Sequence, residues 1–367
     1  MMQHQASVSA GDIFDSISPT SPNSEEAATE DGKADDCGSF VCSDDEIDIE
    51  EVCEPVERYA DGPYYPICIG DILAGSYRVV HKLGWGGFST VWMTYDLKRH
   101  KLVALKIGIP GKMGERELHA QKEILRTVQD VSRHLTFLDT FSLVGVNGTH
   151  LVMVFPVRGP SLHGFLRGLE VKTRMKASKQ LLSALESLHD AGIVHCGNIF
   201  LADFGLAVNT GSPHTVNTTC KWQSPAVYCA PERFHGIGPS FASDMWSYMC
   251  LFAELYLGVV PFQGRANATA VSSLVRSLGP LPSQWHGSYD AGDTPEEFWY
   301  DQAQRPYTLV TLEEISKRAR PEIDGTERKL VLSVFSKVFT YLPEHRLTAA
   351  ELLQDKDFNA IMALYGC

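Results

Sequence analysis

A glycine-rich run stands at residues 83–91, Leu83-Gly84-Trp85-Gly86-Gly87-Phe88-Ser89-Thr90-Val91, where one run of strand-forming residues turns into the next. Glycines have no Cβ, so the backbone amides of such a turn can approach the oxygens of a phosphate group closely. An isolated run of this kind is more often an ordinary glycine-rich hairpin. The run therefore predicts a phosphate-binding loop only if a second feature supports it.

A lysine supplies that second feature. Lys106 ends the run Val103-Ala104-Leu105-Lys106, which follows the glycine-rich loop on the next predicted strand. A strand lysine in this position can hold the α and β phosphates of a nucleotide, whereas a lone lysine is usually a surface residue with a solvated ammonium group. Loop and lysine together favour nucleotide binding. On the helix predicted next, Glu123 is expected to pair with Lys106, and Glu117 is the alternative.

A second phosphate-binding candidate, Gly108-Ile109-Pro110-Gly111-Lys112-Met113, does not meet the requirements of a Walker A loop. Such a loop needs four residues between its glycines and a serine or threonine directly after its lysine. This run has neither feature, so a Walker-type ATPase is rejected.

The predicted elements divide the chain into a strand-rich part and a helical part. The runs YRVVHKL, STVWMTYD and KLVALKI read as strands joined by tight turns, and Asn147-Gly148 is a strong hairpin signal. One helix, residues 115–129, is inserted among these strands. Helical periodicity then marks residues 171–190, 242–258, 326–340 and 348–364, the last opened by a capping box of Thr348 and Glu351. A small antiparallel sheet followed by helices, without alternating βαβ units, predicts an α+β fold.

The acidic residues are concentrated at the start of the chain. Residues 1–70 carry 17 of the 45 Asp and Glu residues and only two of the 32 Lys and Arg residues, so this stretch accounts for the net charge of −13. Residues 1–58 are too polar and charged to offset their ordering entropy, and we expect a disordered acidic leader before a folded domain at 59–364. The near-neutral remainder lacks the basic surface that holds nucleic acid phosphates, so direct nucleic acid binding is not expected.

The cysteines and the apolar segments indicate in which cellular compartment the protein is expected. The nine cysteines are scattered, with no CxxC pair and no zinc-site spacing. The N-terminus has no apolar signal segment, and the most apolar stretches are too short to span a bilayer. We therefore expect a protein with reduced thiols in the cytoplasm and nucleus, without a membrane partner.

Several motifs resemble the protein kinase superfamily, and specifically the SR-protein kinases and their fungal relatives. The lead-in and loop YYPICIGDILAGSYRVVHKLGWGGFSTVWM (64–93) and the strand VNGTHLVMVF (146–155) carry the closest likeness. Asp203-Phe204-Gly205, Ala230-Pro231-Glu232 and Asp244-Met245-Trp246-Ser247 follow in the order that kinases use. The resemblance covers roughly residues 64–364.

The resemblance implies a two-lobed kinase fold, with a small β lobe at about 64–157 and a helical lobe at about 160–364. It also implies a serine/threonine protein kinase that transfers the γ-phosphoryl group of ATP, with Mg2+, to hydroxyl groups of protein substrates. Arg-Ser-rich splicing or RNA-processing factors are the substrates that this family suggests.

Individual roles follow from the same resemblance. Ala104, Phe155 and Val157 are expected to surround the adenine, with Phe155 as gatekeeper and the backbone of Val157 in the hinge. Asp203 is expected to bind magnesium. Asn198 is either a second magnesium ligand or a turn residue.

Three further residues have structural roles in the resemblance. Glu232 is expected to form a buried pair with Arg346, and Asp244 belongs to the motif that opens a central helix.

The catalytic loop departs from the family. Kinases read His-x-Asp-x-x-x-x-Asn, in which the aspartate accepts the proton of the substrate hydroxyl. Here His195 and Asn198 are only three positions apart, and no aspartate lies between them. The four residues 199–202 are also too few for the β-hairpin that relatives place before Asp203. We therefore name no general base. The interpretations left open are an impaired kinase, an ATP-binding pseudokinase that acts as a scaffold, and a shortened transcript or gene model.

Overall fold

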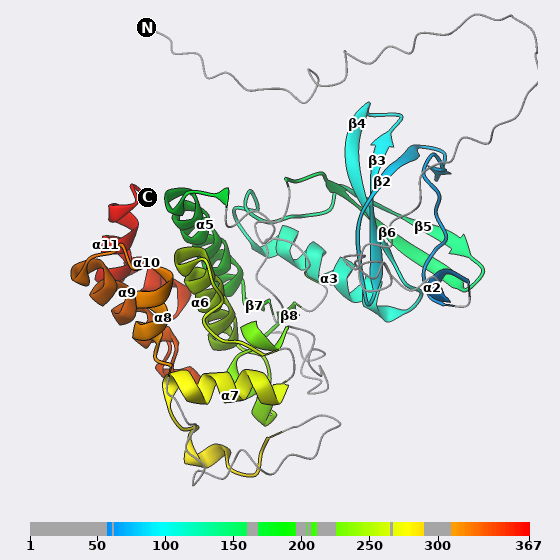
Figure 1. Ribbon diagram of the computed structural model, residues 1–367. Helices are drawn as coiled ribbons and strands as arrows, with labels where there is room; N and C mark the ends of the chain where they lie inside the picture. Colours follow the sequence, from blue (N-terminus) through cyan, green and yellow to red (C-terminus); the bar gives the residue numbers. More distant parts are fainter. Residues whose placement is uncertain are drawn as a thin grey trace, which may run out of the picture. The chain divides into compact units, whose positions relative to one another are not determined.

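The computed structural model describes residues 57–60, 62–159, 168–195, 204, 207–210, 225–264, 267–289 and 310–367 (Figure 1). All of them belong to one unit of the chain, Glu54–Cys367. Residues 1–56 lie outside the described residues, so disorder in the acidic leader stays a prediction. None of the helices in the described part of the chain is long and apolar enough to cross a membrane.

The N-terminal part is a six-stranded sheet in the order β1-β2-β3-β4-β6-β5, with every neighbouring pair antiparallel. Its strands are β1 Ile72–Leu73, β2 Tyr77–Gly86, β3 Ser89–Asp96, β4 Lys101–Gly108, β5 Asp139–Gly145 and β6 Gly148–Pro156. The hairpin predicted at Asn147-Gly148 is confirmed, because it joins β5 to β6 where Gly145 pairs with Gly148. Gly148 has a φ of 130°, which a side chain would oppose.

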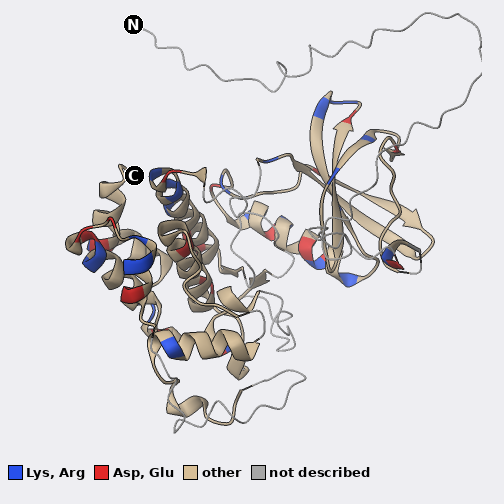
Figure 2. Ribbon diagram, in the orientation of Figure 1, with Lys and Arg blue, Asp and Glu red and all other residues tan. Residues whose placement is uncertain are grey.

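The strand alternation gives this sheet two different faces. Trp92, Val103, Leu105 and Ile107 share one buried cluster, and we call their side the outer face. Since successive side chains of a strand point to opposite sides, Ala104 and Lys106 lie on the other side, which we call the lysine face. Helix α3 Lys112–Thr127 packs against β6, and its charged residues line the helix in Figure 2.

The chain before β1 covers part of the outer face. Tyr65 and Ile67 pack against the outer-face cluster, and Tyr64 is buried. Before them lies the short helix α2 Glu57–Ala60. This helix corrects the predicted end of the leader at residue 58, because Arg58 belongs to α2 and bonds Tyr64.

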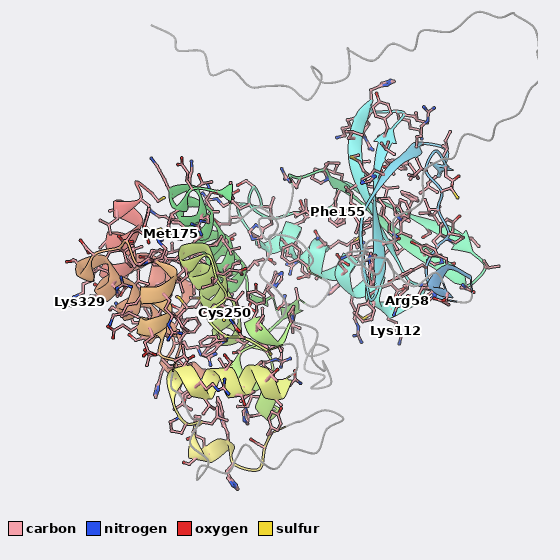
Figure 3. The ribbon with its side chains drawn as sticks, viewed as in Figure 1. Arg58, Lys112, Phe155, Met175, Cys250 and Lys329 are labelled. Carbon is pink, nitrogen blue, oxygen red and sulfur yellow. The ribbon has the colours of Figure 1, made fainter. Side chains whose placement is uncertain are left out.

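The C-terminal part is helical. Its helices are α5 Val171–Asp190, α6 Phe241–Leu257, α7 Asn267–Leu278, α8 Leu312–Ala319, α9 Gly325–Val338, α10 Ala349–Gln354 and α11 Lys356–Leu364, and a two-stranded sheet pairs β7 Ile193–Val194 with β8 Val208–Asn209. Helix α6 is largely apolar, and every residue from 243 to 257 except Leu251 is buried, which is typical of a central core helix. Met175 of α5 and Cys250 of α6 both lie in this core (Figure 3).

The helical predictions are confirmed for 171–190, 242–258 and 326–340, but 348–364 is two helices. Asp355 has an extended ψ of 130°, and its carboxylate accepts the amides of Asp357 and Phe358, so it ends α10 and caps α11. The capping box is confirmed, since Thr348 Oγ1 accepts the Glu351 amide and a Glu351 carboxylate oxygen accepts the Thr348 amide. The prediction did not include α7 or α8.

Arg346 joins three segments of the helical part: its own stretch from residue 340, the segment of Glu232 and the start of α6. Its Nη1 and Nη2 each donate to a different carboxylate oxygen of Glu232, both at 2.7 Å, and the two side chains are 0% exposed. The remaining N–H groups donate to the carbonyls of Thr340, Tyr341 and Ala242. Since a guanidinium has five N–H groups, every one of them has an acceptor. The pair that the resemblance implied is therefore present, and its hydrogen bonding is complete.

We expect Glu232→Gln to lower the free energy of unfolding by about 3 kcal/mol or more, because the substitution leaves the Arg346 charge buried without its counter-charge. Urea unfolding followed by circular dichroism measures this change. The matched control is Glu313→Gln, the same substitution in the Glu313–Lys317 pair, whose side chains are 52% and 58% exposed. Exposed pairs are worth at most about 1 kcal/mol, so equal effects in the two variants would contradict the assigned role of Glu232.

Candidate nucleotide site

The glycine-rich loop is the turn between β2 and β3, closed where Gly86 pairs with Ser89. A Cβ added at Gly84, Gly86 or Gly87 would meet no atom within 4 Å. The loop is thus bordered by open space, and a phosphate group could reach its amides. Its larger side chains are accessible as well, with Leu83, Trp85 and Phe88 exposed by 48%, 44% and 45%.

An apolar cluster lies on the lysine face next to this loop. It brings together the three predicted adenine-side residues Ala104, Phe155 and Val157, with Val91 of the glycine-rich run and Met153, Leu118, Leu135 and Phe137 around them. Figure 3 marks Phe155 on β6. Apolar walls of this kind suit a flat heteroaromatic ring. The assignment of these residues to adenine stays a prediction.

Thr90 differs from the other residues of the predicted loop. Its side chain is 1% exposed, and its hydroxyl accepts a hydrogen bond from Trp92 Nε1 at 3.1 Å. Trp92 lies on the outer face, so the Thr90 side chain is turned away from the lysine face. Only the backbone of Thr90 is left to contact a ligand there.

Lys106 pairs with Glu117, which corrects the expected partner Glu123. Lys106 Nζ lies 2.7 Å from Glu117 Oε1, with the side chains 16% and 8% exposed. Glu117 belongs to the buried stripe of α3, together with Gly114, Gln121 and Ile124. Glu123 is six residues further along, which at about 100° per residue places it on a different side of the helix.

Glu123 has other partners. Its carboxylate lies 2.7 Å from Arg126 Nη2, and Asn209 Nδ2 donates to it at 3.5 Å. The hydrogen bond from Arg126 lowers the pKa of Glu123 below its ordinary value. Glu123 therefore links α3 to the segment after Phe204. The stripe at 114, 117, 121 and 124 is the sequence signal that would have selected Glu117.

Asp244 fixes the start of the catalytic-loop segment. Its Oδ2 accepts the backbone N–H of His195 at 2.6 Å and lies 3.2 Å from His189 Nε2. The ring of His195 meets that of Phe204 edge to face, with 5.3 Å between their centroids. Phe204 in turn is buried in a cluster with Ile124 of α3. The helical part and α3 thus meet through the phenylalanine of the DFG motif.

The predicted magnesium ligands Asp203 and Asn198 lie outside the described residues, as do Gly205 and the shortened stretch 199–202. Their roles stay predictions. Within the described ranges, no group of three or more His, Cys, Asp and Glu side chains is arranged to hold a metal ion.

Two buried polar residues that the sequence analysis did not single out attach the loop after α3. His134 Nε2 lies 3.2 Å from the Ala184 carbonyl of α5, and burial lowers the pKa of its imidazole. Gln121 Nε2 donates to the Leu135 carbonyl at 3.1 Å. Both contacts join segments that are far apart in the sequence. Neither His134 nor Gln121 belongs to a motif from which its contact could have been predicted.

Comparison with known proteins gives a consistent result. The protein kinase domain family model matches residues 77–358. A serine/threonine protein kinase of Aspergillus fumigatus is 24% identical over 86% of this chain and 92% of its own length. The serine/threonine-protein kinase spk-1 of Caenorhabditis elegans is 34% identical, over 54% of this chain and 21% of its own length. SRSF protein kinase 3 of Homo sapiens is 35% identical, over 38% of this chain and 27% of its own length.

The family match spans the sheet, the lysine pair and the helical part, and the named relatives are serine/threonine kinases. The chain therefore belongs to the protein kinase family.

Proposed function

We propose that this chain binds MgATP as a serine/threonine kinase of the SR-protein kinase type, with Arg-Ser-rich protein substrates. We further propose that its own phosphoryl transfer is slow, because no carboxylate lies between His195 and Asn198. The substrate class rests on the likeness to spk-1 and SRSF protein kinase 3, at identities of 34% and 35%.

The pair of Lys106 and Glu117 is the observation that carries nucleotide binding. An ammonium group held at 2.7 Å by a nearly buried carboxylate keeps one position, next to an open glycine-rich loop and an apolar cluster. Phosphate oxygens near this ammonium would be stabilised by charge, and the purine ring would lie against Ala104 and Phe155. Loop and lysine thus suit the phosphate groups of a nucleoside triphosphate, and the cluster suits its base.

Magnesium would be held by Asp203, with Asn198 as the candidate second ligand. The ion held there would supply positive charge that offsets the charge of the phosphate groups. The described residues Phe204 and His195 support this placement, because their ring contact fixes the residue directly after Asp203.

Without a general base, the chain could bind nucleotide and still transfer the γ-phosphoryl group slowly. In kinases the loop aspartate orients the attacking hydroxyl and accepts its proton. Residues 196–202 read Cys-Gly-Asn-Ile-Phe-Leu-Ala, so this stretch offers no carboxylate for the task. Asp203 is needed for magnesium and cannot serve both purposes.

A second candidate function follows from the same absence. A chain with the lysine pair but without the base could act as an ATP-binding pseudokinase, whose nucleotide-bound fold serves as a scaffold for protein partners. Binding measurements cannot separate this function from the first, whereas transfer measurements can.

We expect MgATP to raise the thermal unfolding temperature of the wild type and not that of Lys106→Ala. Glu117→Gln should weaken MgATP binding about tenfold, a loss of about 1.4 kcal/mol, because the ammonium loses the carboxylate that holds it. Isothermal titration calorimetry measures the affinity. The matched control is Glu123→Gln, which should bind as the wild type does. Stronger weakening by Glu123→Gln than by Glu117→Gln would refute the pairing, and no binding by the wild type would refute the proposed function.

We expect restoration of a His-x-Asp-x-x-x-x-Asn loop and its following hairpin to raise γ-phosphate transfer at least about a hundredfold, the usual contribution of a general base. The assay compares the chain as given with the restored chain, on an Arg-Ser peptide and on a generic basic protein. Asp203→Ala in each background is the control. If the unrestored chain matches the restored one and Asp203→Ala abolishes both activities, another carboxylate is the base. If the restored chain also fails to transfer, the scaffold function is favoured.

A further inference from the structure

The segment before the sheet forms a compact turn on the glycine-rich loop. We call residues 57–60 and 62–64 the N-terminal segment. The Tyr64 amide donates to the Arg58 carbonyl at 2.8 Å, and a Cβ added at Gly62 would lie 2.4 Å from Arg58 Cα. Only glycine fits so close to another backbone, so the turn brings Tyr64 back beside Arg58.

Two side chains of this segment hold the loop by its carbonyl groups. The Tyr64 hydroxyl donates to the Gly86 carbonyl. Arg58 Nη1 donates to the Gly87 carbonyl at 3.3 Å and to the Tyr64 hydroxyl at 2.9 Å, and its guanidinium lies 5.2 Å from the centroid of the Tyr64 ring. The two loop carbonyls are therefore bound by one connected pair of side chains. Figure 3 shows Arg58 beside the sheet.

The segment is itself attached to the outer face. Lys82 Nζ donates to the Tyr59 hydroxyl at 2.7 Å and lies 5.2 Å and 5.0 Å from the ring centroids of Tyr59 and Trp92. Burial raises the pKa of Tyr59 to about 12. Asn147 Nδ2, from the β5–β6 turn, donates to the Gly62 carbonyl.

Because peptide units are planar, binding of the two carbonyls also sets the direction of the neighbouring loop amides. In a trans peptide unit the C=O and the N–H point in opposite directions. The unit that contains the Gly86 carbonyl also contains the Gly87 amide, and the Gly87 carbonyl shares its unit with the Phe88 amide. Because the carbonyls are bound by the N-terminal segment, these two amides are directed away from the segment and the outer face that it covers.

The pairing of Gly86 with Ser89 closes the turn, and beyond it packing adds little. No atom lies within 4 Å of a Cβ added at Gly86 or Gly87, so packing against side chains does not restrict these two residues. Glycine has the largest conformational freedom of any residue, and ordering it on binding lowers affinity. Hydrogen bonds to the two carbonyls would remove part of that cost before a ligand arrives.

We propose that Arg58 and Tyr64 are positioning residues of the nucleotide site, which hold the Gly86 and Gly87 carbonyls from the outer face so that the loop amides stay turned to the phosphate groups of a nucleoside triphosphate. This role rests on the proposed nucleotide binding. Neither side chain touches the nucleotide. Each acts through the backbone of the loop.

The test compares Tyr64→Phe with Tyr65→Phe, because each variant removes one hydroxyl from neighbouring tyrosines. Tyr65 packs its ring edge to face on His150 with a centroid separation of 5.2 Å and serves as the matched control. Hydrogen exchange of residues 83–91, measured from milliseconds to minutes without nucleotide, reports the loop directly. Calorimetry with MgAMP-PNP reports its affinity, and thermal unfolding reports global stability.

We expect faster loop exchange and about fivefold weaker MgAMP-PNP binding in Tyr64→Phe, the effect of losing its one hydrogen bond to the loop. Arg58→Ala should act in the same direction. Arg58→Lys should show a smaller effect than Arg58→Ala, because lysine keeps a donor but lacks the planar guanidinium that lies near the Tyr64 ring. Tyr65→Phe should match the wild type, and the unfolding temperature should change equally little in both tyrosine variants.

The outcomes separate this proposal from the proposed function. Equal affinity and equal loop exchange in Tyr64→Phe, Arg58→Ala and the wild type would overturn the positioning role and leave nucleotide binding intact. Loop exchange that rises only together with exchange throughout the sheet would also overturn it, since that pattern marks general destabilisation. Faster loop exchange in a protein whose wild type binds no MgAMP-PNP would overturn the nucleotide assignment and the proposed function together.

Discussion

The buried guanidinium of Arg346 is the constraint on which the helical part depends. Removing a charge from water costs several kcal/mol unless its partners replace the solvent, and here five N–H groups have five acceptors. Those acceptors come from Glu232, from Ala242 at the start of α6 and from residues 340–341. None of these segments can shift without leaving a donor of a buried cation unsatisfied. The arrangement therefore specifies where the segment after residue 225 lies against α6.

From α6, contacts between neighbouring residues lead to the nucleotide site. Trp246 lies under the Arg346 guanidinium at 5.0 Å, and Asp244, two residues earlier, accepts the His195 amide. The His195 ring meets Phe204, and Phe204 shares a cluster with Ile124 of α3. The same buried stripe of α3 carries Glu117, the partner of Lys106. The position of the lysine pair thus depends on packing in the helical part as well as on the sheet.

The sequence predicted local features well and long-range partners less well. The Asn147-Gly148 hairpin and the Thr348 capping box depend on residues a few positions apart, and both are present. Glu117 and Glu123 are glutamates of the same predicted helix. Only where α3 starts and which of its sides is buried show that Glu117, and not the expected Glu123, faces Lys106. Similarly, the break at Asp355 requires an extended ψ that the apolar periodicity of 348–364 does not reveal.

The resemblance supplied what periodicity could not. The pair of Glu232 and Arg346 joins residues 114 positions apart, and no local pattern would have selected it. By contrast, neither periodicity nor the resemblance predicted the contacts of Arg58 with the loop, since composition assigned this residue to an acidic leader. A single arginine in such a stretch carries no periodic signal. The position of Arg58 also depends on a turn in which Gly62 comes so close to the Arg58 backbone that only a residue without a side chain fits.

Binding and transfer rest on different physical grounds in this chain. The candidate nucleotide site is a collective property: the loop is held by its carbonyls, the lysine by Glu117, and the apolar cluster by four elements of the sheet and helix. Such a site persists while the fold persists, because each part is fixed by contacts that also stabilise the domain. Proton acceptance, by contrast, belongs to one carboxylate on one loop, and no packing interaction depends on its charge. A kinase fold can therefore carry only Cys196 and Gly197 between His195 and Asn198 and keep the contacts of Lys106 and of the glycine-rich loop.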